Sequence, residues 1–266
     1  GYGNVAGVAG GLANPYFARF STSATTTVLA DALAQTPTFF SLWIGGNDVL
    51  GYATSGGVGV NQTGNNNAAT YASNDITDPG VFAYVYNALI TNLTANGAKG
   101  VVANLPYVST LPYFTTVPYN PLSASVLGSG NAAVGQATIS ALNTQLYGPL
   151  KSALTYLSAG DRINLLSTTA SNPLLIKDES LTNLSAQLTQ VLTPTLGAQN
   201  AAVYGAVYGQ ARQATATDLI LLPTQSVIGS APTATNSGLG IAPPSPLDKF
   251  GITFPLQDAH VLIPSE

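Results

Sequence analysis

Two short apolar runs, joined by one amphipathic segment, dominate the pattern of hydrophobic and polar positions in the first half of the chain. Residues 39–44 are almost continuously apolar and include three aromatic rings, which is typical of a strand buried on both faces of a parallel sheet. Residues 101–105 form a second run of this kind. Between them, apolar residues recur at helical spacing over residues 82–93. The pattern predicts two adjacent parallel strands joined by a right-handed helical crossover.

Local signals mark both ends of this helix. Asp78 is a residue type that accepts hydrogen bonds from the first free N–H groups of a helix, and Pro79 suits the first helical position. At the other end, Asn96 and Gly97 are residue types that adopt the left-handed backbone on which helices end. The helix is therefore expected to lie between these two pairs.

The rest of the chain has the pattern of an α/β domain with long loop insertions. Further helices are expected over residues 24–35 and 132–157, short strands over 174–176 and 219–222, and loops over 51–72, 106–122 and 224–245. The pair Gly148 and Pro149 is expected to interrupt the second of these helices. Neither an internal repeat nor a domain boundary is visible, so one domain over residues 1–266 is expected.

The first apolar run ends abruptly in Gly45, Gly46, Asn47 and Asp48. Two glycines permit a sharp turn at the carboxyl end of a strand, where open α/β sheets bind their ligands. An asparagine placed there can direct its side-chain NH2 group into a cleft as a donor to an oxyanion. The alternative is a turn without further function, because these residue types dominate turns for conformational reasons.

The composition argues against several classes of partner and cofactor. Hydrophobic residues make up 45% of the chain, enough for a sizeable core, while charged residues make up only 7%. The net charge of −4 and the scattered Lys and Arg residues exclude a basic patch, so no nucleic-acid partner is expected. The chain has no cysteine for disulfides or thiolate metal sites, and no apolar run of the length of a transmembrane segment.

Several segments of the chain resemble a bacterial subgroup of the SGNH (GDSL) hydrolases, of the envelope lipoprotein type, which cleave esters with a serine nucleophile. The segments that carry the resemblance are residues 14–20 (NPYFARF), 39–57 (FFSLWIGGNDVLGYATSGG), 74–79 (NDITDP), 97–114 (GAKGVVANLPYVSTLPYF), 212–215 with Asp218, and 255–266 (PLQDAHVLIPSE). The resemblance implies a three-layer α/β/α, flavodoxin-like fold with a parallel sheet. It also implies an extracytoplasmic location, secreted or at the bacterial outer membrane surface.

The resemblance assigns roles to five residues. Asn47 is expected to donate to the oxyanion, and Gly45 and Gly46 to form the turn. Asp48 and Asn104 are expected to have structural roles next to the site, without contact to the reacting atoms. No cofactor or metal is implied, and the expected partner is a small-molecule or glycan ester. Aromatic residues in the neighbouring loops are candidates for an apolar pocket or for packing of the scaffold. They are Tyr52, Tyr107, Tyr113, Phe114 and Tyr119.

Two blocks of the family pattern are missing from these residues. The chain contains no Gly-Asp-Ser and no Asp-x-x-His, so neither a nucleophile nor a general base is assigned within it. The single histidine, His260, follows Asp258 by two positions instead of three, and its surroundings resemble a part of the family without a catalytic role. The chain is therefore expected to be the middle of a longer protein, inactive by itself, with an open sheet position and an exposed apolar face.

Other interpretations remain open at this stage. The missing blocks support an alternative, a non-catalytic SGNH-like scaffold or binding subunit of a bacterial cell-surface assembly. A carbohydrate-binding module is a third, weaker interpretation, which rests only on exposed aromatic residues. The carboxylate pair Asp178 and Glu179 is expected in a solvated loop, because no further ligand for a metal lies nearby in the sequence. Asp258 and His260 are expected on one face of a strand, as a weak surface ion pair.

Overall fold

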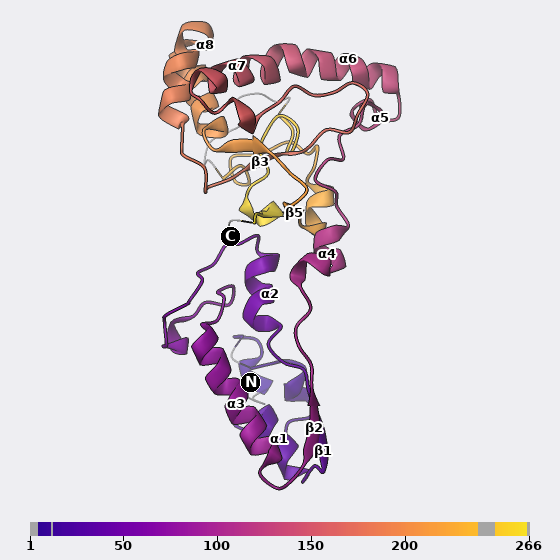
Figure 1. Ribbon diagram of the computed structural model, residues 1–266, viewed down its shortest axis with the longest axis vertical. Coiled ribbons are helices and arrows are strands. Elements are labelled where there is room, and N and C mark those ends of the chain that lie inside the picture. The colour runs from indigo at the N-terminus through magenta and orange to yellow at the C-terminus, as the bar shows by residue number, and fades with distance from the viewer. Residues whose placement is uncertain (1–4, 12, 239–247, 265–266) are drawn as a thin grey trace. The chain divides into compact units, whose positions relative to one another are not determined.

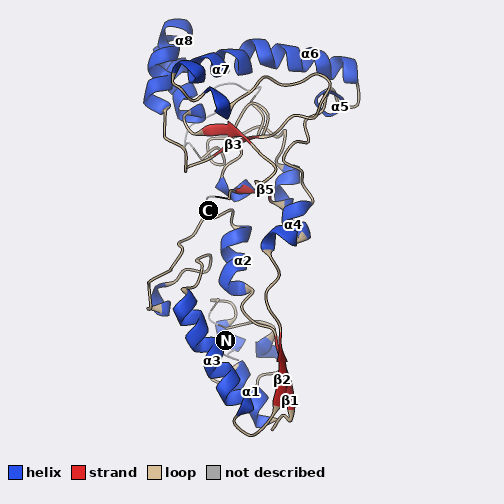
Figure 2. Cartoon of the chain, in the orientation of Figure 1, coloured by secondary structure: helices blue, strands red, loops and turns tan. Residues whose placement is uncertain are grey.

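The computed structural model describes residues 5–11, 13–238 and 248–264, whose contacts group into two compact units (Figure 1). Unit 1 takes Gly1–Val49 and Asn61–Leu105, and unit 2 takes Leu50–Val60 and Pro106–Glu266. Both units contain helices and short strands (Figure 2). The single domain expected from the sequence stays a prediction.

Unit 1 is built on the predicted strand–helix–strand crossover. Strand β1 (Phe39–Leu42) pairs in parallel with β2 (Lys99–Val102), and α3 (Pro79–Thr94) connects them. The register sets Phe39 opposite Lys99 and Leu42 opposite Val102. A Cβ atom at Gly100 would lie 2.5 Å from the Phe40 ring, so glycine lets this ring lie flat on the neighbouring strand. The predicted adjacency of the two parallel strands is confirmed.

The expected ends of α3 are also confirmed. The Asp78 side chain accepts a hydrogen bond from the Val81 backbone N–H at 2.8 Å, and Pro79 is the first helical residue. After the helix, Gly97 adopts a φ of +83°. Helix α1 (Val28–Ala34) is shorter than the 24–35 segment expected, because Thr27 caps it by accepting from the Ala30 N–H.

One face of the β1–β2 sheet is uncovered. Figure 1 shows α1 and α3 on one side of the two strands. On the other face Phe39, Trp43 and Val101 are 62, 73 and 58% exposed. The described residues add no third strand, so both edges of the sheet are open. The prediction that residues 39–44 are buried on both faces is therefore wrong, whereas the expected open sheet with an exposed apolar face is confirmed. The structure is a mixed α/β one with a small parallel sheet.

Residues 51–72 are less irregular than expected. Helix α2 (Asn47–Thr54) occupies their start, with Tyr52 and Ala53 buried, and a 3-10 turn, η3 (Ala68–Thr70), lies near their end. Two further 3-10 turns, η1 (Val5–Gly7) and η2 (Phe17–Arg19), precede α1. The loop prediction for residues 51–54 is wrong because the turn at Gly45 starts a helix, so that the glycine-rich stretch begins only after Thr54.

Unit 2 is mostly helical in the middle of the chain. Its shorter helices are η4 (Val108–Thr110), α4 (Pro112–Thr115), α5 (Ala124–Leu127), η6 (Gly160–Arg162), η7 (Leu222–Ser226) and η8 (Asp258–His260). The expected helix over residues 132–157 is present as α6 (Ala132–Leu142), a π turn η5 (Asn143–Tyr147) and α7 (Gly148–Tyr156). The interruption expected at Gly148 takes the form of this π turn, next to Pro149, which has no N–H to donate.

Helix α8 (Ser185–Tyr208) was not predicted from the sequence. It folds back on itself at Gly197, whose φ of +75° and ψ of 157° are not helical. Thr189 Oγ1 donates to the Ala201 carbonyl at 3.3 Å, and a Cβ atom at Gly205 would lie 2.2 Å from Thr189 Oγ1. The two halves therefore pack closely as an antiparallel pair that only small residues permit.

Two small antiparallel sheets complete unit 2. Strand β3 (Leu175–Lys177) pairs with β4 (Ala211–Gln213), and β5 (Leu219–Ile220) pairs with β6 (Val261–Leu262). Strands were expected close to the positions of β3 and β5. A loop was expected over residues 224–245. Its first residues belong to the 3-10 turn η7, and residues 239–245 lie outside the described residues.

Two buried tyrosines tie the helices of unit 2 to its C-terminal segment. The Tyr147 hydroxyl donates to the Ile252 carbonyl at 2.5 Å, and the Tyr208 hydroxyl donates to the Thr253 carbonyl at 2.6 Å. Burial raises the pKa of both phenols.

Within the ranges that the structure describes, every helix is too short or too polar to cross a lipid bilayer.

Candidate functional site

The candidate site is the turn between β1 and α2, in unit 1. Gly45 adopts a φ of +113°, and a Cβ atom there would lie 2.9 Å from the Phe82 ring of α3 and 3.3 Å from Leu105 Cδ1. Glycine is therefore required twice, for the backbone conformation and for the close approach of the strand end to α3. The turn closes with a hydrogen bond of 3.0 Å from the Asp48 N–H to the Gly45 carbonyl.

Asn47 is the first residue of α2 and is exposed. Within the part of the chain that the structure describes, its side chain makes no hydrogen bond, so its NH2 group is available to a ligand. Its position at a helix N-terminus adds the positive end of the helix dipole, which favours negative charge nearby. These are the properties of a donor to a developing oxyanion.

Asp48, unlike Asn47, is held in place by hydrogen bonds to Thr77. Its Oδ1 atom accepts from Thr77 Oγ1 at 2.8 Å, and its carbonyl accepts from the Thr77 backbone N–H at 3.3 Å. Thr77 directly precedes Asp78, the capping residue of α3. Asp48 therefore anchors the turn to the start of α3, and its side chain accepts its hydrogen bond from Thr77.

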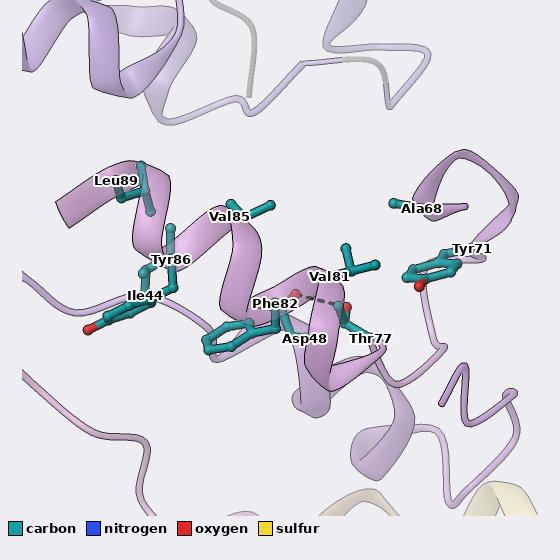
Figure 3. Close-up of a pocket in the computed structure, with 10 residues that line it drawn as sticks. All are labelled: Ile44, Asp48, Ala68, Tyr71, Thr77, Val81, Phe82, Val85, Tyr86 and Leu89. Atoms are coloured by element: carbon teal, nitrogen blue, oxygen red, sulfur yellow. Dashed lines mark hydrogen bonds between the residues drawn. The ribbon is translucent and has the colours of Figure 1, made fainter. Parts of the chain in front are cut away.

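A hollow of about 290 Å³ opens beside the turn (Figure 3). Figure 3 shows the Asp48–Thr77 hydrogen bond at one end and the side chains of α3 along its length. The lining is mainly apolar and consists of Ile44, Asp48, Ala68, Tyr71, Thr77, Val81, Phe82, Val85, Tyr86 and Leu89. Asp48 is its one charged residue, and Asn47 is not part of the lining. The expectation that Asn47 points into a cleft stays a prediction.

Asn104 lies close to the same turn. It follows β2 by two residues, and the parallel register carries it to the level of Ile44, just before Gly45. The Ala103 N–H donates to the Leu42 carbonyl at 2.9 Å, which extends the pairing towards this end of the sheet. Gly45, Gly46, Asn47, Asp48 and Asn104 therefore gather at the carboxyl ends of two parallel strands, as the sequence predicted.

His260 belongs to unit 2 and has structural contacts there. Its Nδ1 atom accepts the Gln257 backbone N–H at 3.2 Å, and its ring centroid lies 5.5 Å from that of Phe250. Burial lowers the pKa of the imidazole, so the neutral form with its proton on Nε2 is favoured. The described residues give it no hydrogen bond to a serine.

The expected ion pair of Asp258 and His260 on one strand face is wrong, because both residues lie in the 3-10 turn η8. The described part of the chain contains no ion pair between them. Burial and the nearby Glu179 carboxylate both raise the pKa of Asp258. This favours its protonated form.

The solvated loop expected at Asp178 is also wrong. Asp178 is only 4% exposed, and Arg212 Nε donates to its Oδ2 atom at 2.6 Å. The Nη1 and Nη2 groups of Arg212 donate to the two Asp218 oxygens at 2.7 Å each. Burial alone would raise the pKa of Asp178, but hydrogen bonds from Ser180 and Arg212 lower it. This network was not predicted from the sequence, because Arg212 lies far from Asp178 along the chain and is brought next to it only by the pairing of β4 with β3.

The aromatic loop residues divide between core and surface. Phe114 and Tyr52 are buried in unit 2, where Phe114 packs with Ala53 and Leu221. Tyr107 is exposed. For Phe114 and Tyr52, packing of the scaffold is the role that their burial supports.

Among the described residues no group of three or more His, Cys, Asp or Glu side chains is placed to hold a metal ion.

Comparison of the chain with protein-family models, with curated proteins and with solved structures finds no match. The turn combines the exposed Asn47 amide, which makes no hydrogen bond to any residue that the structure describes, with a helix N-terminus and with an apolar hollow beside Asp48.

Proposed function

We propose that this chain is part of a serine ester hydrolase of the SGNH (GDSL) type, in which Asn47 supplies the side-chain donor of the oxyanion hole. One observation carries the proposal. A parallel strand ends in an obligatory glycine turn that presents Asn47, exposed and without a hydrogen-bond partner among the described residues, at the start of a helix. The proposal includes a three-layer α/β/α sheet in the complete protein and an extracytoplasmic location, secreted or at the bacterial outer membrane surface.

The mechanism follows the chemistry of acyl transfer. A serine hydroxyl attacks the ester carbonyl while a histidine accepts its proton, and both residues lie outside these 266 residues. The carbonyl oxygen then carries negative charge, which Asn47 shares with backbone N–H groups. Such a donor is worth roughly 3–4 kcal/mol of the barrier. The apolar hollow beside Asp48 suits the uncharged acyl part of a small-molecule or glycan ester.

The proposal is tested on the protein as encoded, with the sequences that flank this chain. A fluorophosphonate that labels activated serines is expected to modify one serine upstream of these residues, with loss of hydrolysis of a p-nitrophenyl ester. Replacing the histidine of a downstream Asp-x-x-His block should abolish both. Labelling that persists without this histidine, or no ester hydrolysis by the intact protein, contradicts the proposal.

A non-catalytic scaffold, serving as a binding subunit of a surface assembly, is the second candidate. The uncovered face of the β1–β2 sheet favours it, because Phe39, Trp43 and Val101 offer an apolar surface to another chain. The flanking sequences separate the two candidates. Intact flanks that lack both the serine block and the Asp-x-x-His block favour the scaffold.

A further inference from the structure

Two hollows in unit 2 join into one trough along α7 and α8. The first, of about 480 Å³, lies between the two helices, and its floor includes the buried residues Leu146, Leu150 and Leu192. The second, of about 440 Å³, lies further along the same helices. Tyr156 and Val191 line both hollows, so the two form one continuous surface, defined here as the α7–α8 trough. None of its lining residues belongs to the segments that resemble the SGNH hydrolases.

The lining of the trough is uncharged and mainly apolar in the first hollow, and it has a larger polar share in the second hollow, defined here as the polar end. Neither hollow is lined by an Asp, Glu, Lys, Arg or His side chain. Several amide and hydroxyl side chains face it and make no hydrogen bond within the residues that the structure describes. These side chains are Gln145, Ser152, Gln187, Gln190 and Thr195. The trough therefore offers hydrogen bonds but no partner for a charge.

The polar end has two further features that suit a hydroxyl-rich group. The Tyr156 ring is 79% exposed and gives a flat apolar surface. Pro194 has no N–H, so the Gln190 carbonyl lacks the hydrogen bond that residue 194 would otherwise donate in a helix. That carbonyl can accept from a ligand, and the Gln187 and Gln190 amides can both donate and accept.

We infer that the α7–α8 trough binds a neutral, single-chain amphiphile. The alkyl or acyl chain lies over the apolar floor between α7 and α8. The uncharged, hydroxyl-rich head group lies against Tyr156, where Gln187 and Gln190 form hydrogen bonds with its hydroxyls. A charged head group is disfavoured because the lining has no residue to compensate its desolvation. The site does not depend on Asn47 or on the proposed ester hydrolysis.

Isothermal titration of the whole chain with octyl, nonyl and decyl maltoside, each below its micelle-forming concentration, tests this inference. The dissociation constant should fall about fourfold with each added methylene, because each one buries more apolar surface. Decyl sulfate and decyltrimethylammonium should bind at least tenfold more weakly than decyl maltoside, and maltose alone should give no measurable heat. The absence of binding, an affinity independent of chain length, or equal affinity for the charged amphiphiles overturns the inference.

Variants locate the binding. Thr195→Glu places a charge in the trough and Tyr156→Ala removes the ring, so each should weaken decyl maltoside binding at least tenfold. The matched controls are Gln199→Glu, an exposed position on α8 outside the trough lining, and Tyr107→Ala, an exposed tyrosine elsewhere in unit 2. Trp43→Ser tests binding to the apolar sheet face of unit 1. All three controls should keep the wild-type affinity, and equal losses in controls and trough variants would show non-specific binding.

Discussion

Thr77 holds Asp48 with two hydrogen bonds, one from its hydroxyl to Asp48 Oδ1 at 2.8 Å and one from its backbone N–H to the Asp48 carbonyl at 3.3 Å. These bonds join the start of α2 to the start of α3, although the two residues lie 29 positions apart in the sequence. The turn that presents Asn47 is therefore supported from the segment that caps α3.

Thr77→Val should loosen this turn. The substitution keeps the shape of the side chain but removes the hydroxyl, leaving Asp48 Oδ1 without its partner. Unit 1 should lose about 1 kcal/mol of unfolding free energy, measured by urea denaturation. Thr77→Ser retains the hydroxyl and serves as the control. If valine and serine are equally stable, the side-chain hydrogen bond contributes nothing.

Asp78 should make the stability of unit 1 depend on pH. The backbone N–H groups of Gly64 and Val81 lower its pKa below the ordinary value of 3.8. A carboxylate with a lowered pKa in the folded state stabilises the fold fully above its unfolded pKa. That contribution is lost as the pH falls through the lower, folded value.

Asp78→Asn should remove this acid-dependent part of the stability, since asparagine still caps the helix but does not titrate. Thermal melts between pH 2 and pH 5 measure the effect. Asp161→Asn is the control, because Asp161 is exposed and accepts no hydrogen bond among the described residues. A pH profile of the Asp78 variant that matches the wild type would refute the assignment.

Tyr208→Phe should destabilise unit 2 without changing its packing. The buried Tyr208 hydroxyl donates to the carbonyl of the half-buried Thr253 at 2.6 Å, so the variant leaves this acceptor without its donor. The expected loss is about 1–2 kcal/mol in urea unfolding. Tyr156→Phe, at an exposed position on α7, should have no effect. If Tyr208→Phe and Tyr156→Phe have the same unfolding free energy, the prediction is wrong and the Thr253 carbonyl has another donor in the variant.

Local signals in the sequence predicted the elements whose ends depend on a few neighbouring residues. Asp78 and Pro79 start α3 as expected, because capping involves only backbone groups within the first helical turn. The pairing of β1 with β2 also followed from the sequence, since a short crossover between apolar runs favours adjacent parallel strands.

Features that depend on distant residues could not be predicted. Asp178 is buried because Arg212, 34 positions later, pairs with it across β3 and β4. The long helix α8 was missed because Pro194 and Gly197 lie within it, and these residues usually end helices. An apolar run also does not reveal whether both faces of its strand are covered. The exposed apolar face that includes Phe39 and Trp43 was expected only because two blocks of the family pattern are missing from the chain.

The central claim is that Asn47 stabilises an oxyanion, and the most direct test is the kcat of Asn47→Ala in the intact protein on a p-nitrophenyl ester. Asn96→Ala, another exposed asparagine without a side-chain hydrogen bond in the described residues, is the matched control. We predict that Asn47→Ala lowers kcat by roughly 10²–10³ with an unchanged melting temperature, while Asn96→Ala retains wild-type kcat. A kcat of Asn47→Ala equal to that of the wild type would contradict the account.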